Sequence, residues 1–173
     1  MKHFIKLGVV SAVATLVTLG GCAGQPRPTA MPGSDSALMK GRHVAKLGGS
    51  ETMTSQFALF DGGKLDVAVD LQRRFPSTRQ SCSQASYFLL GSDRSVMHQV
   101  QLPELCMYFS GTEAKRKTHA TKQATYSVRI PAQIVGSARY VAVIHHRADE
   151  NAERILQSRQ GTPGLFALPS QTL

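Results

Sequence analysis

Tryptophan is absent from this chain, and aromatic residues make up only 6% of it. The scarcity of flat rings argues against a surface that binds sugars or nucleic-acid bases by stacking. Acidic residues are also few, because 11 aspartates and glutamates stand against 20 lysines and arginines, for a formal net charge of +9. A surface of this charge suits anionic partners.

The short motifs of several enzyme classes are missing as well. The sequence contains no G-x-S-x-G elbow, no H-E-x-x-H and no Walker-type phosphate loop, which argues against the hydrolases and nucleotide-binding enzymes that use them. Asp66 and Asp70 lie four residues apart on a predicted strand, and their spacing of roughly 13 Å is too long for a shared acid–base site. We therefore expect a non-catalytic protein without a cofactor.

Long hydrophobic runs are limited to the N-terminus. Residues 7–19 are mostly apolar and follow the positive residues Lys2 and Lys6. The run is shorter than the roughly 20 residues of a transmembrane helix, and no second run follows, which argues against an ordinary integral membrane protein. A positive start, an apolar middle and small residues at the end are the three parts of an export signal. Residues 1–21 are therefore predicted to be a signal peptide.

The signal ends in Leu19-Gly20-Gly21-Cys22, which resembles the lipobox of bacterial lipoproteins. The resemblance implies that Cys22 becomes the lipidated first residue of the mature protein, anchored by its acyl chains. Ala23 stands where an aspartate retains such proteins in the inner membrane, so the resemblance implies the periplasmic face of the outer membrane. Loss of Lys2 and Lys6 with the signal lowers the net charge from +9 to +7. Anionic partners there include lipopolysaccharide, phospholipid, peptidoglycan and acidic proteins, whereas nucleic acid is not expected.

Cysteine is scarce, with three residues in all. If lipid occupies Cys22, the remaining Cys82 and Cys106 form an even pair in an oxidising compartment, which predicts a disulfide. A metal or redox pair is the alternative, but the spacing is not C-x-x-C and no suitably spaced histidines accompany it.

Proline and glycine mark the segment after the lipobox. Pro26, Pro28, Pro32 and Gly33 lie close together among polar residues, a composition typical of a flexible tether. We expect the lipidated N-terminus and tether to span residues 22–45, with the folded part starting between residues 41 and 50. The domain then spans residues 46–161, followed by an extended tail over residues 162–173.

The folded part alternates between apolar and polar residues in the way that half-buried strands do. The clearest case is residues 65–71, and the glycine-rich turn before it spans residues 61–64. One short helix is expected near the end, capped by Asp149 and ended by Gly161. The predicted fold is all-β, an antiparallel β-sandwich of about seven strands, with a small barrel as the alternative. The expected strands are residues 53–60, 65–71, 85–90, 95–102, 105–109, 124–130 and 139–146.

Two predicted loops, residues 73–83 and 111–122, carry clustered basic residues that could contact anionic groups, or could simply be solvated. The candidate contact residues are Arg73, Arg74, Lys115, Arg116, Lys117 and Lys122. His145 and His146 are adjacent on a predicted strand and therefore point to opposite faces. They cannot easily bind one metal ion by themselves, and we expect no metal site.

Together these patterns favour a lipoprotein whose domain binds a protein partner or envelope component. The architecture is similar to that of accessory lipoproteins of secretion systems and envelope assembly. Two alternatives stay open. Residues 129–144 and the helix after them resemble the end of maltose-operon periplasmic proteins, which implies a role in carbohydrate uptake. Residues 111–122 could instead be the wedge of an inhibitor of an envelope enzyme.

Overall fold

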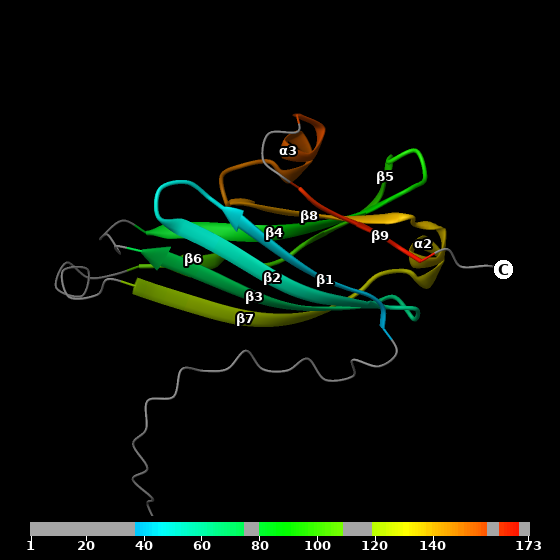
Figure 1. The fold of residues 1–173 in the computed structure, drawn as a ribbon, viewed down its shortest axis with the longest axis horizontal. Coiled ribbons are helices and arrows are strands. Elements are labelled where there is room, and N and C mark those ends of the chain that lie inside the picture. The colour runs from blue at the N-terminus through cyan, green and yellow to red at the C-terminus, as the bar shows by residue number, and fades with distance from the viewer. Residues whose placement is uncertain (1–36, 75–79, 109–118, 159–162, 170–173) are drawn as a thin grey trace, which may run out of the picture.

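Two layers of antiparallel strands make up the body of the protein (Figure 1). The computed structural model describes residues 37–74, 80–108, 119–158 and 163–169. These residues form nine strands and two short helices. In chain order they are β1 (Ala37–Lys46), β2 (Glu51–Phe60), β3 (Lys64–Arg74), β4 (Ser81–Leu90), β5 (Val96–Gln101), β6 (Leu105–Met107), β7 (His119–Arg129), α2 (Ala132–Ser137), β8 (Tyr140–Arg147), α3 (Ala152–Ser158) and β9 (Gly164–Ala167). The predicted all-β sandwich is therefore confirmed.

The strands divide into two sheets. Sheet A has the order β1-β2-β3-β7, and sheet B has the order β5-β4-β8-β9, with β6 paired to the first residues of β4. All these pairs are antiparallel. Antiparallel sheets can bury one face and keep the other in water, and this explains the alternation in the sequence.

The glycine-rich turn predicted at residues 61–64 joins β2 to β3. Its Gly63 has a φ of +77°, in the left-handed region that a residue without Cβ enters at little steric cost. The Gly63 amide donates to the Phe60 carbonyl at 3.0 Å, and its own carbonyl accepts from the Ile130 amide at 2.7 Å. A Cβ at this position would lie 2.0 Å from the Ile130 carbonyl oxygen. The turn therefore requires glycine for both its conformation and its contact with the end of β7.

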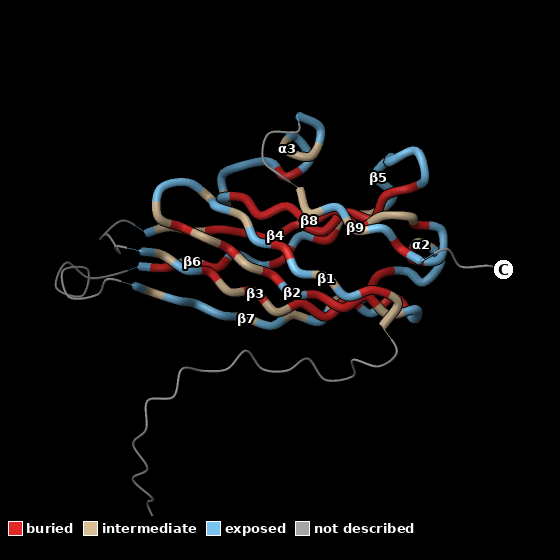
Figure 2. Tube along the Cα trace, in the orientation of Figure 1, coloured by how far each residue is buried: buried red, intermediate tan, exposed pale blue. Residues whose placement is uncertain are grey.

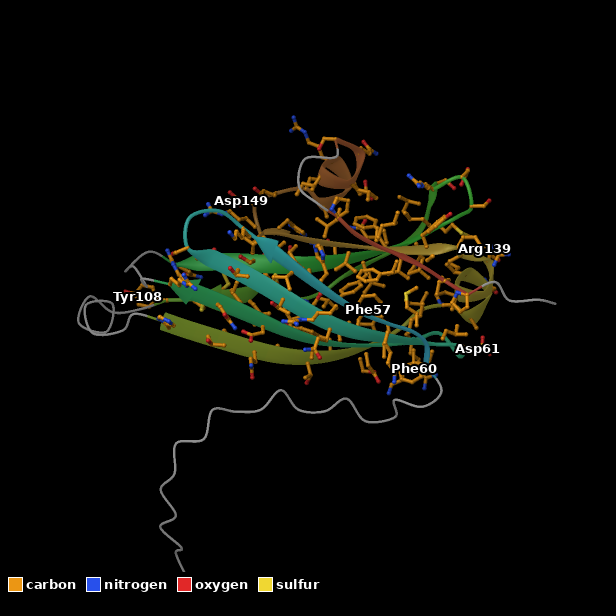
Figure 3. All side chains as sticks on the ribbon, viewed as in Figure 1. Phe57, Phe60, Asp61, Tyr108, Arg139 and Asp149 are labelled. Atoms are coloured by element: carbon orange, nitrogen blue, oxygen red, sulfur yellow. A yellow bond between two sulfur atoms is a disulfide. The ribbon has the colours of Figure 1, made fainter. Side chains whose placement is uncertain are left out.

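The core lies between the two sheets, where burial is concentrated in Figure 2. The alternating strand predicted at residues 65–71 supplies one row of it, with every second side chain buried against sheet B. Phe57, labelled in Figure 3, lies between the layers and packs edge to face with Tyr87 of sheet B at a centroid distance of 5.4 Å. Burial of such large side chains contributes roughly 1.5–3 kcal/mol each.

Helix α3 lies over the outer face of sheet B, as Figure 1 shows. Its Ile155 packs against a small second cluster that includes Phe88 and Ile144. The helix begins after Asn151, whose side-chain oxygen accepts from the Arg154 amide at 3.0 Å as an N-cap does. The prediction of Asp149 as the cap is therefore wrong by two residues, because Asn151 immediately precedes the first helical turn.

The predicted domain boundaries need correction at both ends. Strand β1 begins at Ala37, inside the segment predicted as a tether over residues 22–45, and pairs with β2 along most of its length. Strand β9 lies inside the predicted tail of residues 162–173 and pairs with β8. Both segments are therefore part of the sandwich, and the described residues form nine strands where about seven were expected.

The predicted loops are also shorter than expected. Over residues 73–83, β3 continues through Arg74 and β4 begins at Ser81. Over residues 111–122, the last four residues already belong to β7. The short helix α2, which follows Pro131, was not predicted, and its buried Val135 packs into the core.

Candidate functional site

The two adjacent histidines of β8 point to opposite sides of sheet B, as their positions on a strand predict. His146 is buried beneath the outer face, where its Nε2 lies 3.0 Å from Ser86 Oγ and its Nδ1 donates to the Arg147 carbonyl. His145 points between the sheets, and its Nε2 lies 2.8 Å from Ser55 Oγ of β2. The pair therefore contributes one imidazole to the interior and one to the other face.

The contact between His145 and Ser55 joins the two sheets by a hydrogen bond in the core. Both residues are buried, Ser55 completely and His145 with 7% of its surface exposed. Tyr87 lies beside Ser55, and burial raises the pKa of its hydroxyl despite that neighbour. Burial, followed by the nearby His43, lowers the pKa of His145 to about 3, and the Met53 backbone carbonyl opposes this shift only in part. His145 is consequently a neutral imidazole at neutral pH.

A third histidine, His43 of β1, completes this cluster. Its ring centroid lies 4.8 Å from that of His145, at an interplanar angle of 43°. His43 is only 9% exposed, and burial lowers its pKa. Gly164 of β9 leaves room for the ring, since a Cβ there would lie 2.6 Å from His43 Nδ1. His43, Ser55, Tyr87 and His145 are called the inter-sheet polar cluster below.

Two nitrogens of this cluster have no hydrogen-bond partner of good geometry among the described residues, namely His43 Nε2 and His145 Nδ1. Buried polar atoms are satisfied in the great majority of cases. The Tyr87 hydroxyl is a third such atom in this cluster, but only the two nitrogens lie on rings in contact with each other.

A cavity of about 360 Å³ adjoins the two rings. It lies beside the start of β9, because the pairing of β9 with β8 extends only from Tyr140 to Val143, which is opposite Gly164, and leaves the following residues of β8 without that neighbour. Its lining includes His43, Lys46, Ile144, His145, Ile155 and Pro163.

Ser55 and His145 are in contact as a nucleophile and its base would be. However, Ser55 has no exposed surface, so this hydroxyl is not presented to a substrate. The hydrogen bond holds the sheets together and orients the imidazole toward His43 and the cavity.

The outer face of sheet A has a different character, because it is open and polar. None of the described helices or strands packs on it, whereas α3 covers the corresponding face of sheet B (Figure 1). A shallow hollow of about 400 Å³ lies at its centre, lined by residues that include Arg42, Gln56, Asp70, Gln123 and Thr125. Asp70 accepts hydrogen bonds from Gln72 and Gln123 within this hollow.

Basic side chains outnumber acidic ones on this face. Strand alternation assigns only two acidic residues to it, Asp66 and Asp70, and Asp66 binds Lys64 at 2.7 Å and Ser127 at 2.7 Å. The basic residues at outward positions are Lys40, Arg42, Lys46, Lys64, Arg74 and Arg129. The outer face of sheet A therefore carries basic side chains around a central hollow lined by hydrogen-bonding groups.

The basic residues singled out from the sequence do not gather into one site. Arg73 is mostly buried and pairs with the buried Glu51, with Nε to Oε1 at 3.3 Å, so it belongs to the structure of sheet A. Arg74 is exposed on the outer face, and Lys122 donates to the Cys106 carbonyl at 2.9 Å. Lys115, Arg116 and Lys117 lie outside the described residues. Sequence reasoning missed Lys40, Arg42 and Lys46, although their spacing of two and four residues is itself a strand signal.

The predicted disulfide between Cys82 and Cys106 is present. The two residues are directly opposite each other in the β4–β6 pairing, where cross-strand Cβ atoms are close. The Glu104 carboxylate lies near both sulfur atoms. However, the covalent bond removes the thiolates that a metal ion would bind.

Cys22 lies outside the described residues, so the lipid anchor stays a prediction. None of the helices in the described part of the chain is long and apolar enough to cross a membrane. The chain matches no protein-family model, no curated protein and no solved structure.

Proposed function

We propose that this chain is a lipid-anchored protein on the periplasmic face of the outer membrane, and that its sandwich binds an anionic partner without catalysing a reaction. The anchor is supported by the signal and lipobox pattern that ends at Cys22. More than one acyl chain on a single residue gives durable membrane attachment. The domain would therefore stay close to the membrane.

The observation that carries the binding proposal is the outer face of sheet A. It is broad, open among the described elements, and basic at its rim. Its central hollow offers amide, hydroxyl and guanidinium donors through Gln56, Thr125 and Arg42. Such groups bind carboxylates and phosphates by charge-assisted hydrogen bonds. An acidic protein is the favoured partner, since the face is broad and carries no aromatic residue for stacking on a sugar beyond Phe60 at its end.

The anchor is tested by the substitution Cys22→Ser, followed by fractionation of the cells. We expect the variant to leave the membrane fraction, because serine has no thiol to form the thioether that carries the lipid. Retention of the variant in the membrane fraction would show that another anchor exists.

The binding face is tested by photo-cross-linking in cells. A photoreactive residue at Gln56 or Thr125, both exposed on sheet A, is compared with one at the exposed Glu153 of α3. We expect a discrete protein adduct from the sheet A positions only. Adducts of heterogeneous mass would instead identify an envelope polymer as the partner.

Charge reversal provides the matched control. Lys40→Glu with Arg42→Glu should abolish the adduct, whereas Arg154→Glu on α3 should leave it unchanged. Equal labelling in all three proteins would contradict sheet A as the contact face. Turnover of a peptidoglycan or ester substrate by the purified protein would contradict the non-catalytic proposal.

A further inference from the structure

Two imidazoles from opposite sheets lie next to each other at the edge of a cavity. They belong to His43 and His145, whose ring centroids are 4.8 Å apart. Two ligands of a single ion, each bonded at about 2 Å, can have this separation. Each ring keeps one buried nitrogen without a hydrogen-bond partner among the described residues, Nε2 of His43 and Nδ1 of His145.

The surroundings of His145 resemble those of a metal ligand. A ligating histidine usually holds its second ring nitrogen in a hydrogen bond, which fixes the tautomer and the ring orientation. Ser55 Oγ lies 2.8 Å from His145 Nε2. When Nε2 carries the proton and donates it to Ser55, the lone pair of Nδ1 is available on the other side of the ring.

We propose that His43 and His145 form a two-histidine binding site for a transition-metal ion of the copper class, beside the cavity between β1 and β8. Imidazole nitrogen suits copper, zinc and nickel. The cavity of about 360 Å³ has room for water or a small exogenous ligand to complete the coordination.

The charge of the lining favours a monovalent ion. The described lining residues include Lys46 and contain no carboxylate or thiolate. Burying an ion without charge compensation is costly, and the cost is lower for Cu(I) than for a divalent ion.

The site was invisible in the sequence because its second ligand is not the neighbour His146. His43 lies 102 positions before His145 in the chain, within a segment predicted to be a tether. The expectation of no metal site considered the adjacent pair His145 and His146, which the structure places on opposite faces.

The experiment titrates the full lipidated chain, purified in detergent without a histidine tag, with Cu(I), Zn²⁺ and Ni²⁺ in turn. The Cys82–Cys106 disulfide is kept intact, because free cysteine thiols would bind copper themselves. Ascorbate maintains copper as Cu(I), because a thiol reductant would also compete for the ion. The expected result is one Cu(I) per chain, with Zn²⁺ and Ni²⁺ bound more weakly. Long-range ¹H–¹⁵N spectra should show the ring signals of His43 and His145 moving on addition of metal.

His43→Gln and His145→Gln should each weaken Cu(I) binding by about tenfold or more, since each removes a ligand. His98→Gln on the half-exposed part of β5 is the matched control and should bind as the original protein does. Far-UV circular dichroism establishes whether each variant is folded. If His145→Gln unfolds, His43→Gln, at the edge of sheet A, still tests the site. Unchanged affinity in His43→Gln, or metal-induced shifts confined to other histidines, would overturn the proposal. This outcome does not depend on the binding face of sheet A.

Discussion

The disulfide between Cys82 and Cys106 should be one of the largest single contributions to the stability of the domain. It joins residues separated by 24 positions. By the loop-entropy relation, closing such a loop in the unfolded chain stabilises the folded state by about 3.5 kcal/mol at 25 °C. A natural domain has a total unfolding free energy of roughly 5–15 kcal/mol, so loss of the bond would remove a substantial part of it.

We expect the native packing to survive without the bond, because other contacts hold β6 in place. Strand β6 is held to β4 by pairing on either side of Cys106, and Leu105 and Met107 bury their side chains in the core. Lys122 also donates to the Cys106 carbonyl. The double substitution Cys82→Ala, Cys106→Ala should therefore act mainly on the unfolded ensemble.

The assay is urea denaturation of the oxidised protein and of the double variant, followed by circular dichroism. We expect a loss of about 3.5 kcal/mol together with a larger m-value, because the chain without a cross-link exposes more surface when unfolded. Reduced original protein is the control that separates the bond from the substitutions. A loss under about 1 kcal/mol with an unchanged m-value would refute the unfolded-state reasoning. A loss well above about 5 kcal/mol would show instead that the bond maintains the native position of β6.

Three further predictions concern the sheets. Gly63→Ala should destabilise the domain by about 2 kcal/mol or more, since it combines a positive φ with a backbone clash; Gly62→Ala, where a Cβ meets nothing within 4 Å, should stay within about 0.5 kcal/mol in the same denaturation assay. Ser55→Ala should lower the free energy of unfolding by about 1–3 kcal/mol, because it leaves His145 Nε2 buried without its partner. An unchanged free energy of unfolding would show that another group bonds to this nitrogen in the variant. For Asp66, burial raises the pKa, but hydrogen bonds from Lys64 and Ser127 and the Lys64 charge outweigh it and lower the pKa below 3.8. Its contribution is therefore present above pH 3.8 and is lost as the pH falls through the lowered value. Asp66→Asn should reduce the acid dependence of the unfolding free energy in that range, and an identical pH profile would contradict this assignment.

Several features of the fold follow from local sequence patterns. The strict alternation of residues 65–71 predicted a strand with one buried face, and the two glycines before it predicted its turn. The odd number of cysteines predicted the disulfide, given lipid on Cys22. These predictions succeed because strand period, turn conformation and cysteine pairing depend on few residues at a time.

Strand β1 was missed because its buried face lacks large apolar residues. Its inward positions include Gly41, His43 and Ala45 between more typical core residues. The structure explains the glycine, because the Phe57 ring occupies the space above it and a Cβ there would lie 2.4 Å from two ring carbons. Strand β9 was missed for a related reason, since it has only four residues and begins at a glycine that accommodates His43.

The sequence by itself determined the compositional features of this protein, namely the predicted export signal, the basic charge, the all-β class and the pairing of Cys82 with Cys106. Each depends on a local sequence pattern or on the number of residues of one type. Only the tertiary structure placed His43 against His145, buried Arg73 with Glu51, and left the outer face of sheet A uncovered by any other described helix or strand. These arrangements depend on which strands become neighbours and which sheet faces are covered. Contacts between sheets join residues far apart in the chain, and no local periodicity specifies them.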